Sequence, residues 1–247
     1  MSLINITLIV YVVASISYIV REIWGCKATR WASLGLLILA FCLNLTMVAK
    51  RSIEAGHPPF SNLYESLIFY ACCTAFVYII FEFIYNFRVV GAMASVLTML
   101  ILLYATLQDD TIRPIMPALK SNWMLVHVVT YMLGYAAFGI SFVTSIIYLV
   151  VKPFAGKSKD SKEDEDGREI LPRNFDKLSY KIVAFGFPFL TLGMVTGAVW
   201  AKKAWGDYWS WDPKETWSLI TWLAYLVYLH SPLVLPKMNI NKSKASV

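Results

Sequence analysis

Six tryptophans lie between residues 200 and 222, which sets this stretch apart from the rest of the chain. An interfacial belt in a membrane protein places one or two aromatic residues at each helix end, which accounts for Trp200, Trp217 and Trp222 but not for the others. Trp205, Trp209 and Trp211 fall together in what the pattern predicts to be a short loop. Indole is a large, flat, rigid and mostly apolar surface, as a large conjugated ligand requires. The stretch therefore predicts a slot for such a ligand.

The residues beside these tryptophans suit the same kind of ligand. Gly206 allows a bound molecule to approach the backbone closely. Lys202, Lys203 and Lys214 can pair with carboxylates at a ligand's edge, such as haem propionates. A solvated loop is the simpler explanation of each lysine taken alone. Together these residues favour a large conjugated ligand with acidic groups at its edge, such as haem.

The end of the tryptophan-rich loop carries the signals of a helix start. Asp212 is a good N-cap, Pro213 suits the first helical position and Glu215 stands where a capping box has its acid. We expect these residues to begin the last helix. Asp212 also closes the loop, so it is counted with the candidate cofactor-binding residues, although capping is its main expected role.

His127 is the histidine best placed to bind iron beside this loop. It lies about four residues into a predicted span, hence about 6 Å below the outer surface at about 1.5 Å per residue. Trp123, His127 and Tyr131 share one helix face through their i, i+4 spacing. Imidazole is a common axial ligand of haem iron. We therefore predict that His127 is a metal ligand, with a structural hydrogen bond as the alternative.

His230 lies deeper, about 15 residues into the last predicted span. An ionisable side chain at that depth is costly, which makes it a functional hypothesis by default. We predict that His230 is a second iron ligand, with a hydrogen bond to a neighbouring helix as the alternative.

Apolar blocks of about 18–25 residues position these side chains. The chain has 247 residues, of which 58% are hydrophobic and 15% charged, whereas soluble domains have about 25% charged residues. Each block can cross a hydrocarbon core of about 30 Å. Because backbone groups in lipid need partners within their own segment, we predict an all-α fold, a polytopic transmembrane helix bundle. About seven spans are expected, at residues 3–20, 31–49, 66–83, 89–107, 123–151, 182–200 and 213–235.

Loop charges predict the topology. With the N-terminus outside, most Lys and Arg residues fall in inner loops, as the positive-inside rule requires. We expect two N-terminal transmembrane helices in residues 1–49 and a haem-handling core in residues 50–247. Residues 152–178 are strongly charged and predict a flexible cytoplasmic linker. The tryptophan-rich loop, residues 200–215, then faces outward.

Cysteine spacing and charge exclude several functions. The four cysteines form no Cys-x-x-Cys pair and no Cys-x-x-Cys-His, so the chain is neither a thioredoxin-like carrier nor itself a c-type cytochrome. The net charge of +6 reflects short loops between apolar spans, and we expect no nucleic acid partner. No Ser-His-Asp or Cys-His arrangement is evident, so we expect no catalytic residues in this chain.

The stretch WGDYWSWDPKETWSLITW resembles the WWD signature of haem-handling proteins in cytochrome c biogenesis, and WDPKETW is most similar to the CcsA (ResC) family. Three other stretches agree with that family: GHPPFSNLYES, SNWMLVHV and LSYKIVAFGFPFLTLGMVTGAVWA. The resemblance implies a subunit of a cytochrome c haem lyase complex that works with a CcsB (ResB) partner and has haem b, iron protoporphyrin IX, as its cofactor. It implies that haem crosses the plasma (inner) or thylakoid membrane and is presented to apocytochrome c on the extracytoplasmic side. On this resemblance His127 matches an outer axial ligand and His230 a membrane-embedded histidine that holds haem in transit.

One departure from the family concerns the second axial ligand. The family continues with a further span that carries a second outer histidine in a GLHSY-like stretch, whereas the last residue here is Val247. His57, in a predicted outer loop stiffened by Pro58 and Pro59, is proposed as its substitute. A solvated loop residue is the alternative for His57.

Three functions remain open from the sequence. The first is the haem-binding subunit of a cytochrome c synthase. The second is a CcmC-type protein that loads haem onto a chaperone, which a similar chain length favours. The third is a transporter without haem, which the scarcity of charged residues in the spans argues against.

Overall fold

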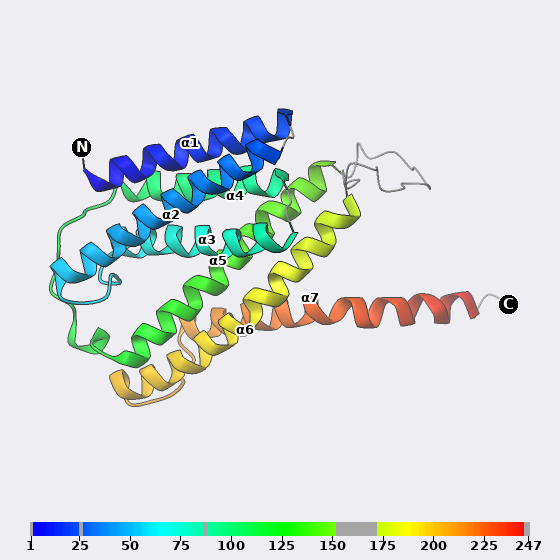
Figure 1. Ribbon diagram of the computed structural model, residues 1–247. Coiled ribbons are helices and arrows are strands. Elements are labelled where there is room, and N and C mark those ends of the chain that lie inside the picture. The colour runs from blue at the N-terminus through cyan, green and yellow to red at the C-terminus, as the bar shows by residue number, and fades with distance from the viewer. Residues whose placement is uncertain (1, 25–26, 86–87, 152–171, 245–247) are drawn as a thin grey trace.

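The computed structural model describes residues 2–24, 27–85, 88–151 and 172–244 (Figure 1). These residues form seven α-helices and one short 3₁₀ helix, and they contain no strand. In chain order the helices are α1 (Leu3–Trp24), α2 (Lys27–Ala55), α3 (Leu63–Tyr85), α4 (Arg88–Ala105), the 3₁₀ helix η1 (Pro117–Leu119), α5 (Asn122–Val151), α6 (Pro172–Trp205) and α7 (Pro213–Lys244).

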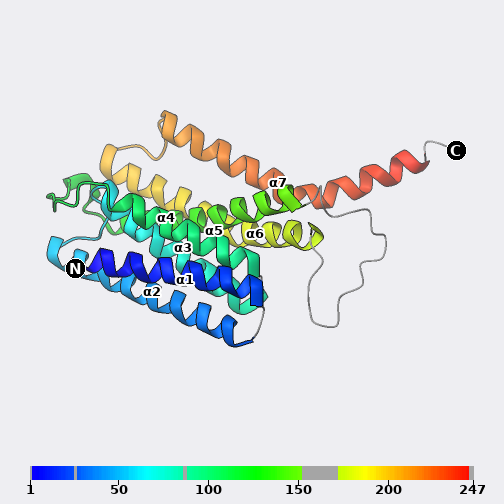
Figure 2. The same cartoon turned by 90° about the horizontal axis from the view of Figure 1, so that it is seen from above.

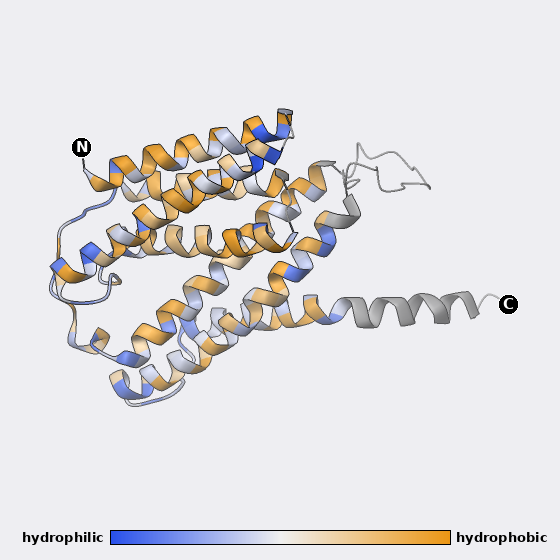
Figure 3. Cartoon of the chain, viewed as in Figure 1, coloured by the Kyte–Doolittle hydropathy of each residue, from blue (hydrophilic) through white to orange (hydrophobic). Residues whose placement is uncertain are grey.

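The length and apolar composition of the helices explain the membrane-bundle architecture. Helices α1, α2, α3, α5 and α6 are long and apolar enough to cross a membrane, and α4 is a shorter apolar helix. Figure 3 shows apolar residues along the helices and hydrophilic ones mostly near their ends. The prediction of a polytopic helical membrane bundle is confirmed. The side on which the N-terminus lies stays a prediction.

The helices pack as two groups. Helix α1 packs against α2 and α4, and α3 packs against α2, α4 and α5. Helices α5 and α6 form a close pair that crosses the first group obliquely, and α7 lies against α6 (Figures 1 and 2). The loops before α3, before α5 and before α7 all lie at one end of the bundle (Figure 1). That end carries the candidate site.

Glycines bring α5 and α6 into close contact. A Cβ added to Gly134 would lie 3.2 Å from the backbone nitrogen of Leu190, and one added to Gly186 would lie 2.8 Å from the Cβ of Ala137. Small residues permit such backbone approach between membrane helices. The pair is therefore held in one register, which fixes what the ends of α5 and α6 present to each other.

A buried ion pair joins the first group at the opposite end. Arg21 on α1 donates to Glu82 on α3 at 2.7 Å, with both side chains almost fully buried. The hydroxyl of Tyr78 also donates to Glu82. Charges at this depth are stable only when paired and hydrogen-bonded. The cluster therefore fixes α1 against α3.

The observed helix ends differ from the predicted spans mainly at the start of α6 and at the end of α7, which runs to Lys244 and not to residue 235. This helix begins at Pro172, so the last seven residues of the predicted linker 152–178 are helical, while residues 152–171 lie outside the described residues. Pro172 suits the first turn of a helix, and Phe175 and Leu178 are buried in the core, which explains the early start. Helix α2 likewise runs to Ala55, past the predicted boundary at residue 49. The division into domains stays a prediction.

Candidate functional site

A cavity of about 450 Å³ opens between α5, the end of α6 and the start of α7. Its aromatic lining residues are His127, Tyr131, Tyr135, Trp200, Trp205, Tyr208, Trp209 and Trp217. Asp212, Lys214 and Glu215 add charge where α7 begins. Protein ligand sites are typically cavities of about 300–1,000 Å³ lined mostly by apolar and aromatic groups. This aromatic cavity is called the main cavity below.

His127 is held in one orientation by α6. Its Nδ1–H donates to the carbonyl of Gly193 at 2.8 Å. Gly197 lies so close that an added Cβ would come within 2.5 Å of that nitrogen. The Tyr131 ring packs edge-on at 4.8 Å, and the Trp200 ring is nearly parallel at 6.0 Å. This arrangement fixes the tautomer and leaves the Nε2 lone pair for a ligand in the cavity.

Trp200 is a deeply buried aromatic wall of the main cavity. Only 6% of it is exposed, and its Nε1–H donates to the carbonyl of Ala118 at 2.9 Å. Trp205 packs against it edge-on, with ring centroids 4.6 Å apart. The sequence interpretation assigned Trp200 to an interfacial belt, whereas the structure makes it part of the cavity. Trp217, which was assigned in the same way, also lines the cavity.

Trp209 supplies a donor without a partner. Its Nε1 is buried and has no hydrogen-bond partner among the described residues. A buried donor left unpaired costs about 1–3 kcal/mol. The indole therefore fits a ligand that carries an acceptor into the main cavity.

The loop before α7 is shorter than predicted. Helix α6 continues to Trp205, since Ala201, Lys202, Lys203 and Ala204 all favour helix. It ends at Gly206, whose φ of 99° only glycine adopts readily. Trp205 therefore stands on a helix and not in the loop, which corrects the predicted loop of residues 200–215. A Cβ added to Gly206 would meet no atom within 4 Å, so the role that the structure shows for this glycine is its backbone conformation.

The start of α7 is capped as the sequence predicts. The backbone N–H of Glu215 donates to Asp212 Oδ1 at 2.7 Å. Glu215 Oε2 in turn accepts the backbone N–H of Ser210 at 2.7 Å. The capping box thus reaches back two residues further than the usual pattern. It braces the loop that carries Trp209.

Trp211 points away from the main cavity. It has a φ of 60° and is 68% exposed, and it contacts Trp209 edge-on at 5.7 Å between ring centroids. A left-handed backbone is an outlier for so large a residue. Of the three loop tryptophans that were predicted to form the slot, Trp205 and Trp209 line it and Trp211 does not.

His230 lies far from the main cavity. It follows Pro213 by about 26 Å along the helix axis at about 1.5 Å per residue. Its Nδ1 bonds the carbonyl of Leu226 within α7 at 2.7 Å, and its side chain is exposed. The neighbouring carbonyl of Leu229 accepts a hydrogen bond from Tyr180 on α6. The structure therefore separates His230 from His127.

His57 is engaged elsewhere. Its Nδ1 lies 2.9 Å from the carbonyl of Pro58, and its Nε2 lies 3.2 Å from the carbonyl of Arg113. It is not among the residues that line the main cavity. To bind iron there, His57 would have to leave both carbonyls. We therefore do not carry it forward as a ligand.

Sequence reasoning missed the α6 side of the site. Gly193 accepts the hydrogen bond of His127, Gly197 makes room for its ring, and Met194 lines the cavity between them. The signal was present as GMVTG, a G-x-x-x-G pattern typical of closely packed membrane helices. Its glycines face α5 and position the imidazole.

The fold and the site together define a polytopic helical membrane protein with an aromatic cavity built around one histidine. The family model described as cytochrome C assembly protein matches residues 60–247. The cytochrome c biogenesis protein CcsA of Guillardia theta is 40% identical and covers 92% of this chain, which spans 81% of that relative. CcsA of Chlamydomonas reinhardtii is 41% identical over 77% of this chain and 54% of the relative, and CcsA of Microcystis aeruginosa is 36% identical over 81% and 74%.

A solved structure shares the fold. The cytochrome c haem lyase CcmF superposes with a TM-score of 0.65 at 16% identity, covering 94% of this chain. The chain spans 41% of the length of that lyase. This chain belongs to the CcsA family of cytochrome c assembly proteins, and it is a multi-pass membrane protein of cytochrome c biogenesis. The predicted family is confirmed.

Proposed function

We propose that the chain binds haem b in the main cavity and presents it to apocytochrome c, as the haem-binding membrane subunit of a cytochrome c synthase. The carrying observation is the imidazole of His127, whose Nδ1–H is held by Gly193 and whose Nε2 is left for iron among indole walls. An orienting partner on the second ring nitrogen is typical of metal-binding histidines. Bound haem would supply the vinyl groups that take up cysteine thiols, while the chain supplies position and electrostatics.

The other residues of the main cavity have supporting roles. Trp200, Trp205 and Trp209 would flank the ring. Gly206 and Asp212 shape the loop and the start of α7 that hold Trp209 in place.

His230 is proposed as a second, deeper haem contact in transit. Its Nδ1 is engaged within α7, so Nε2 is the nitrogen left for iron. An exposed imidazole on a predicted membrane-spanning helix is energetically costly, and its presence there therefore suggests a function. The two histidines would then act at different depths and not on one iron.

Membership of the family supports a proposal for the cellular setting. We propose that the chain works with a CcsB/ResB-like membrane partner in the plasma (inner) or thylakoid membrane. The tryptophan-rich loop would face the extracytoplasmic side, where apocytochrome c approaches. The relatives named above are CcsA proteins, which favours this function over the CcmC-type loading of haem onto a chaperone.

Absorption spectroscopy of the purified full-length chain tests the proposal. The wild type is expected to bind haem with a strong Soret band. In His127→Gly the Soret band is expected to shift and most of the affinity for haem to be lost. Added imidazole is expected to restore both the band position and the affinity, because the free base fills the space of the lost ring. His57→Ala serves as the control and is expected to leave the spectrum unchanged.

Two results would overturn the proposal. One is a wild-type chain that does not bind haem above background. The other is a His127→Gly chain whose spectrum and affinity match the wild type. Rescue by imidazole distinguishes a lost ligand from a misfolded protein.

A further inference from the structure

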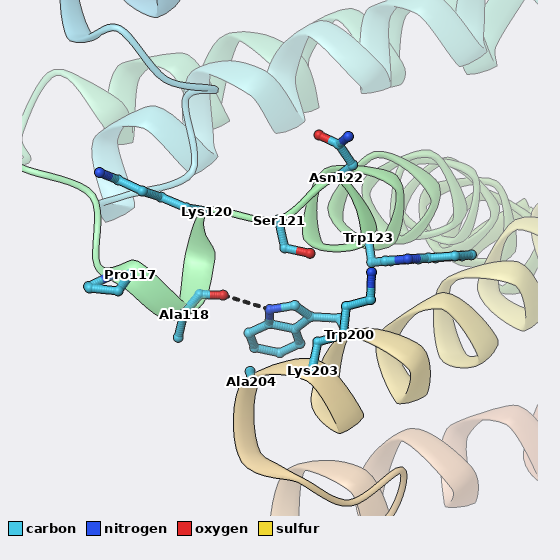
Figure 4. Close-up of a pocket in the computed structure, with 9 residues that line it drawn as sticks. All are labelled: Pro117, Ala118, Lys120, Ser121, Asn122, Trp123, Trp200, Lys203 and Ala204. Atoms are coloured by element: carbon cyan, nitrogen blue, oxygen red, sulfur yellow. Dashed lines mark hydrogen bonds between the residues drawn. The ribbon is translucent and has the colours of Figure 1, made fainter.

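A second cavity, of about 460 Å³, lies across Trp200 from the main cavity. It is formed by η1, the start of α5 and the end of α6 (Figure 4). Figure 4 shows the Trp200 indole reaching from α6 to the carbonyl of Ala118 on η1. Trp200 lines both cavities, so one indole separates them.

The two cavities differ in charge. Lys120 and Lys203 line the second cavity, and none of its lining residues is acidic. In the main cavity, Lys214 is accompanied by the carboxylates of Asp212 and Glu215. An anion is therefore favoured in the second cavity and opposed by two carboxylates in the main one.

Neither lysine of the second cavity is neutralised. Across the part of the chain that the structure describes, no salt bridge involves Lys120 or Lys203. Lys203 lies over the ring of Trp123, 5.8 Å from its centroid. That contact leaves the ammonium's charge in place and holds it beside the cavity.

The start of α5 adds to this positive potential. Ser121, Asn122 and Trp123 line the cavity at the first turn of a 30-residue helix. The first backbone hydrogen bond there runs from Leu125 to the Ser121 carbonyl, so the preceding N–H groups have no partner within the helix. Helix N-termini favour anions. The two lysines and the start of α5 thus both favour an anion in the second cavity.

We propose that the second cavity binds the propionate carboxylates of the porphyrin whose ring lies in the main cavity, with Lys120 and Lys203 as the binding residues. This inference rests on the proposed function. It assigns the propionates to Lys120 and Lys203, and not to Lys202, whose ammonium donates to Gly206, or to Lys214.

The assignment fixes the orientation of the ring. In protoporphyrin IX the propionates occupy one edge and the vinyl groups lie away from it. With the propionates at η1, the vinyl groups lie on the side of α7, where Trp217 is 66% exposed. The thiols of an apocytochrome then approach from the α7 side.

Haem titration of the full-length chain in nanodiscs tests the proposal. Lys120→Gln and Lys203→Gln are compared with Lys50→Gln, an exposed lysine of α2 paired with Glu54. Because exposed ion pairs are weak, each cavity variant is expected to bind haem about threefold more weakly. The double variant is expected to lose about tenfold, or ~1.4 kcal/mol, while Lys50→Gln matches the wild type.

Haem dimethyl ester identifies the bound group, because its propionates carry no charge. The wild type is expected to bind the ester about tenfold more weakly than haem, and the double variant is expected to bind the ester no worse than the wild type does. Repeating the titration in zwitterionic and in anionic nanodiscs distinguishes a lipid phosphate from a propionate. The losses are expected to be the same in both.

Three outcomes would overturn the assignment while leaving haem binding at His127 intact. The double variant could bind haem as tightly as the wild type. The variants could weaken the ester as much as haem. The losses could appear only in anionic nanodiscs, which would identify a lipid headgroup as the occupant. A wild type that binds neither compound would instead overturn the proposed function.

Discussion

Replacement of Gly197 by alanine perturbs the site through one methyl group. The added Cβ would lie 2.5 Å from His127 Nδ1 and 2.7 Å from Cε1, whereas ordinary contact begins at 3.4 Å. The imidazole must therefore move away from α6 by about 0.9 Å. That movement takes Nδ1 out of hydrogen-bonding range of the Gly193 carbonyl, which it now meets at 2.8 Å.

The expected effect on haem is large because the ring loses its orienting partner. Loss of such a second-shell hydrogen bond costs about 10–100-fold in metal affinity, which is about 1.4–2.7 kcal/mol. Stability responds less, because alanine in a helix gains about 0.5–1 kcal/mol over glycine and offsets part of the clash. We expect Gly197→Ala to fold and to bind haem about tenfold or more weakly.

Gly35→Ala is the matched control. Gly35 lies within α2, and no atom approaches its added Cβ within 4 Å. This variant is expected to gain stability and to keep wild-type haem affinity. Soret titrations and thermal unfolding in detergent measure both quantities. A Gly197→Ala chain with wild-type affinity and spectrum would refute the assignment of His127 as an α6-oriented ligand.

Three further predictions concern stability. Glu82→Gln leaves Arg21 facing an uncharged partner and is expected to lower the free energy of unfolding by about 3 kcal/mol. An Arg21→Met/Glu82→Leu double variant is expected to recover much of that lost stability. Denaturant unfolding measures both variants. Asp212→Ala removes the cap of α7 and is expected to cost about 1 kcal/mol and to raise hydrogen exchange in its first turn, whereas Asp212→Asn does not. The hydrogen bond from the Thr111 backbone N–H lowers the pKa of Asp109. The Asp109 carboxylate therefore stabilises this loop fully above its unfolded-state pKa, and the stabilisation is lost as the pH falls through the folded-state pKa. Asp109→Asn is expected to abolish this acid dependence, measured as hydrogen exchange of the loop amides.

The helices were predictable because length and hydropathy determine them locally. Span positions agree with the helices to within several residues except at the end of α7 and at the start of α6. The N-terminal turns of α6 carry charged residues and depend on burial of Phe175 and Leu178 against other helices. Such tertiary packing is not visible in a local pattern. The capping of α7 by Asp212 was predictable, because it depends on residues three positions apart.

The site was predictable only in part. The spacing of His127 and Tyr131 on one helix face was correct, and both line the main cavity. The contribution of α6 was missed because Gly193 acts through its backbone carbonyl and Gly197 through its lack of a side chain. Neither role can be recognised from the residue type alone. Trp211 was assigned to the slot because a positive φ, which turns it outward, is not expected of tryptophan.

The left-handed backbone of Trp211 also gives the loop two differently directed indole rings. Trp209 faces inward to the main cavity, while Trp211 presents its ring to the surroundings, and the two rings touch edge-on. A displacement of the outer ring would therefore reach the inner one directly, through a single pair of indoles.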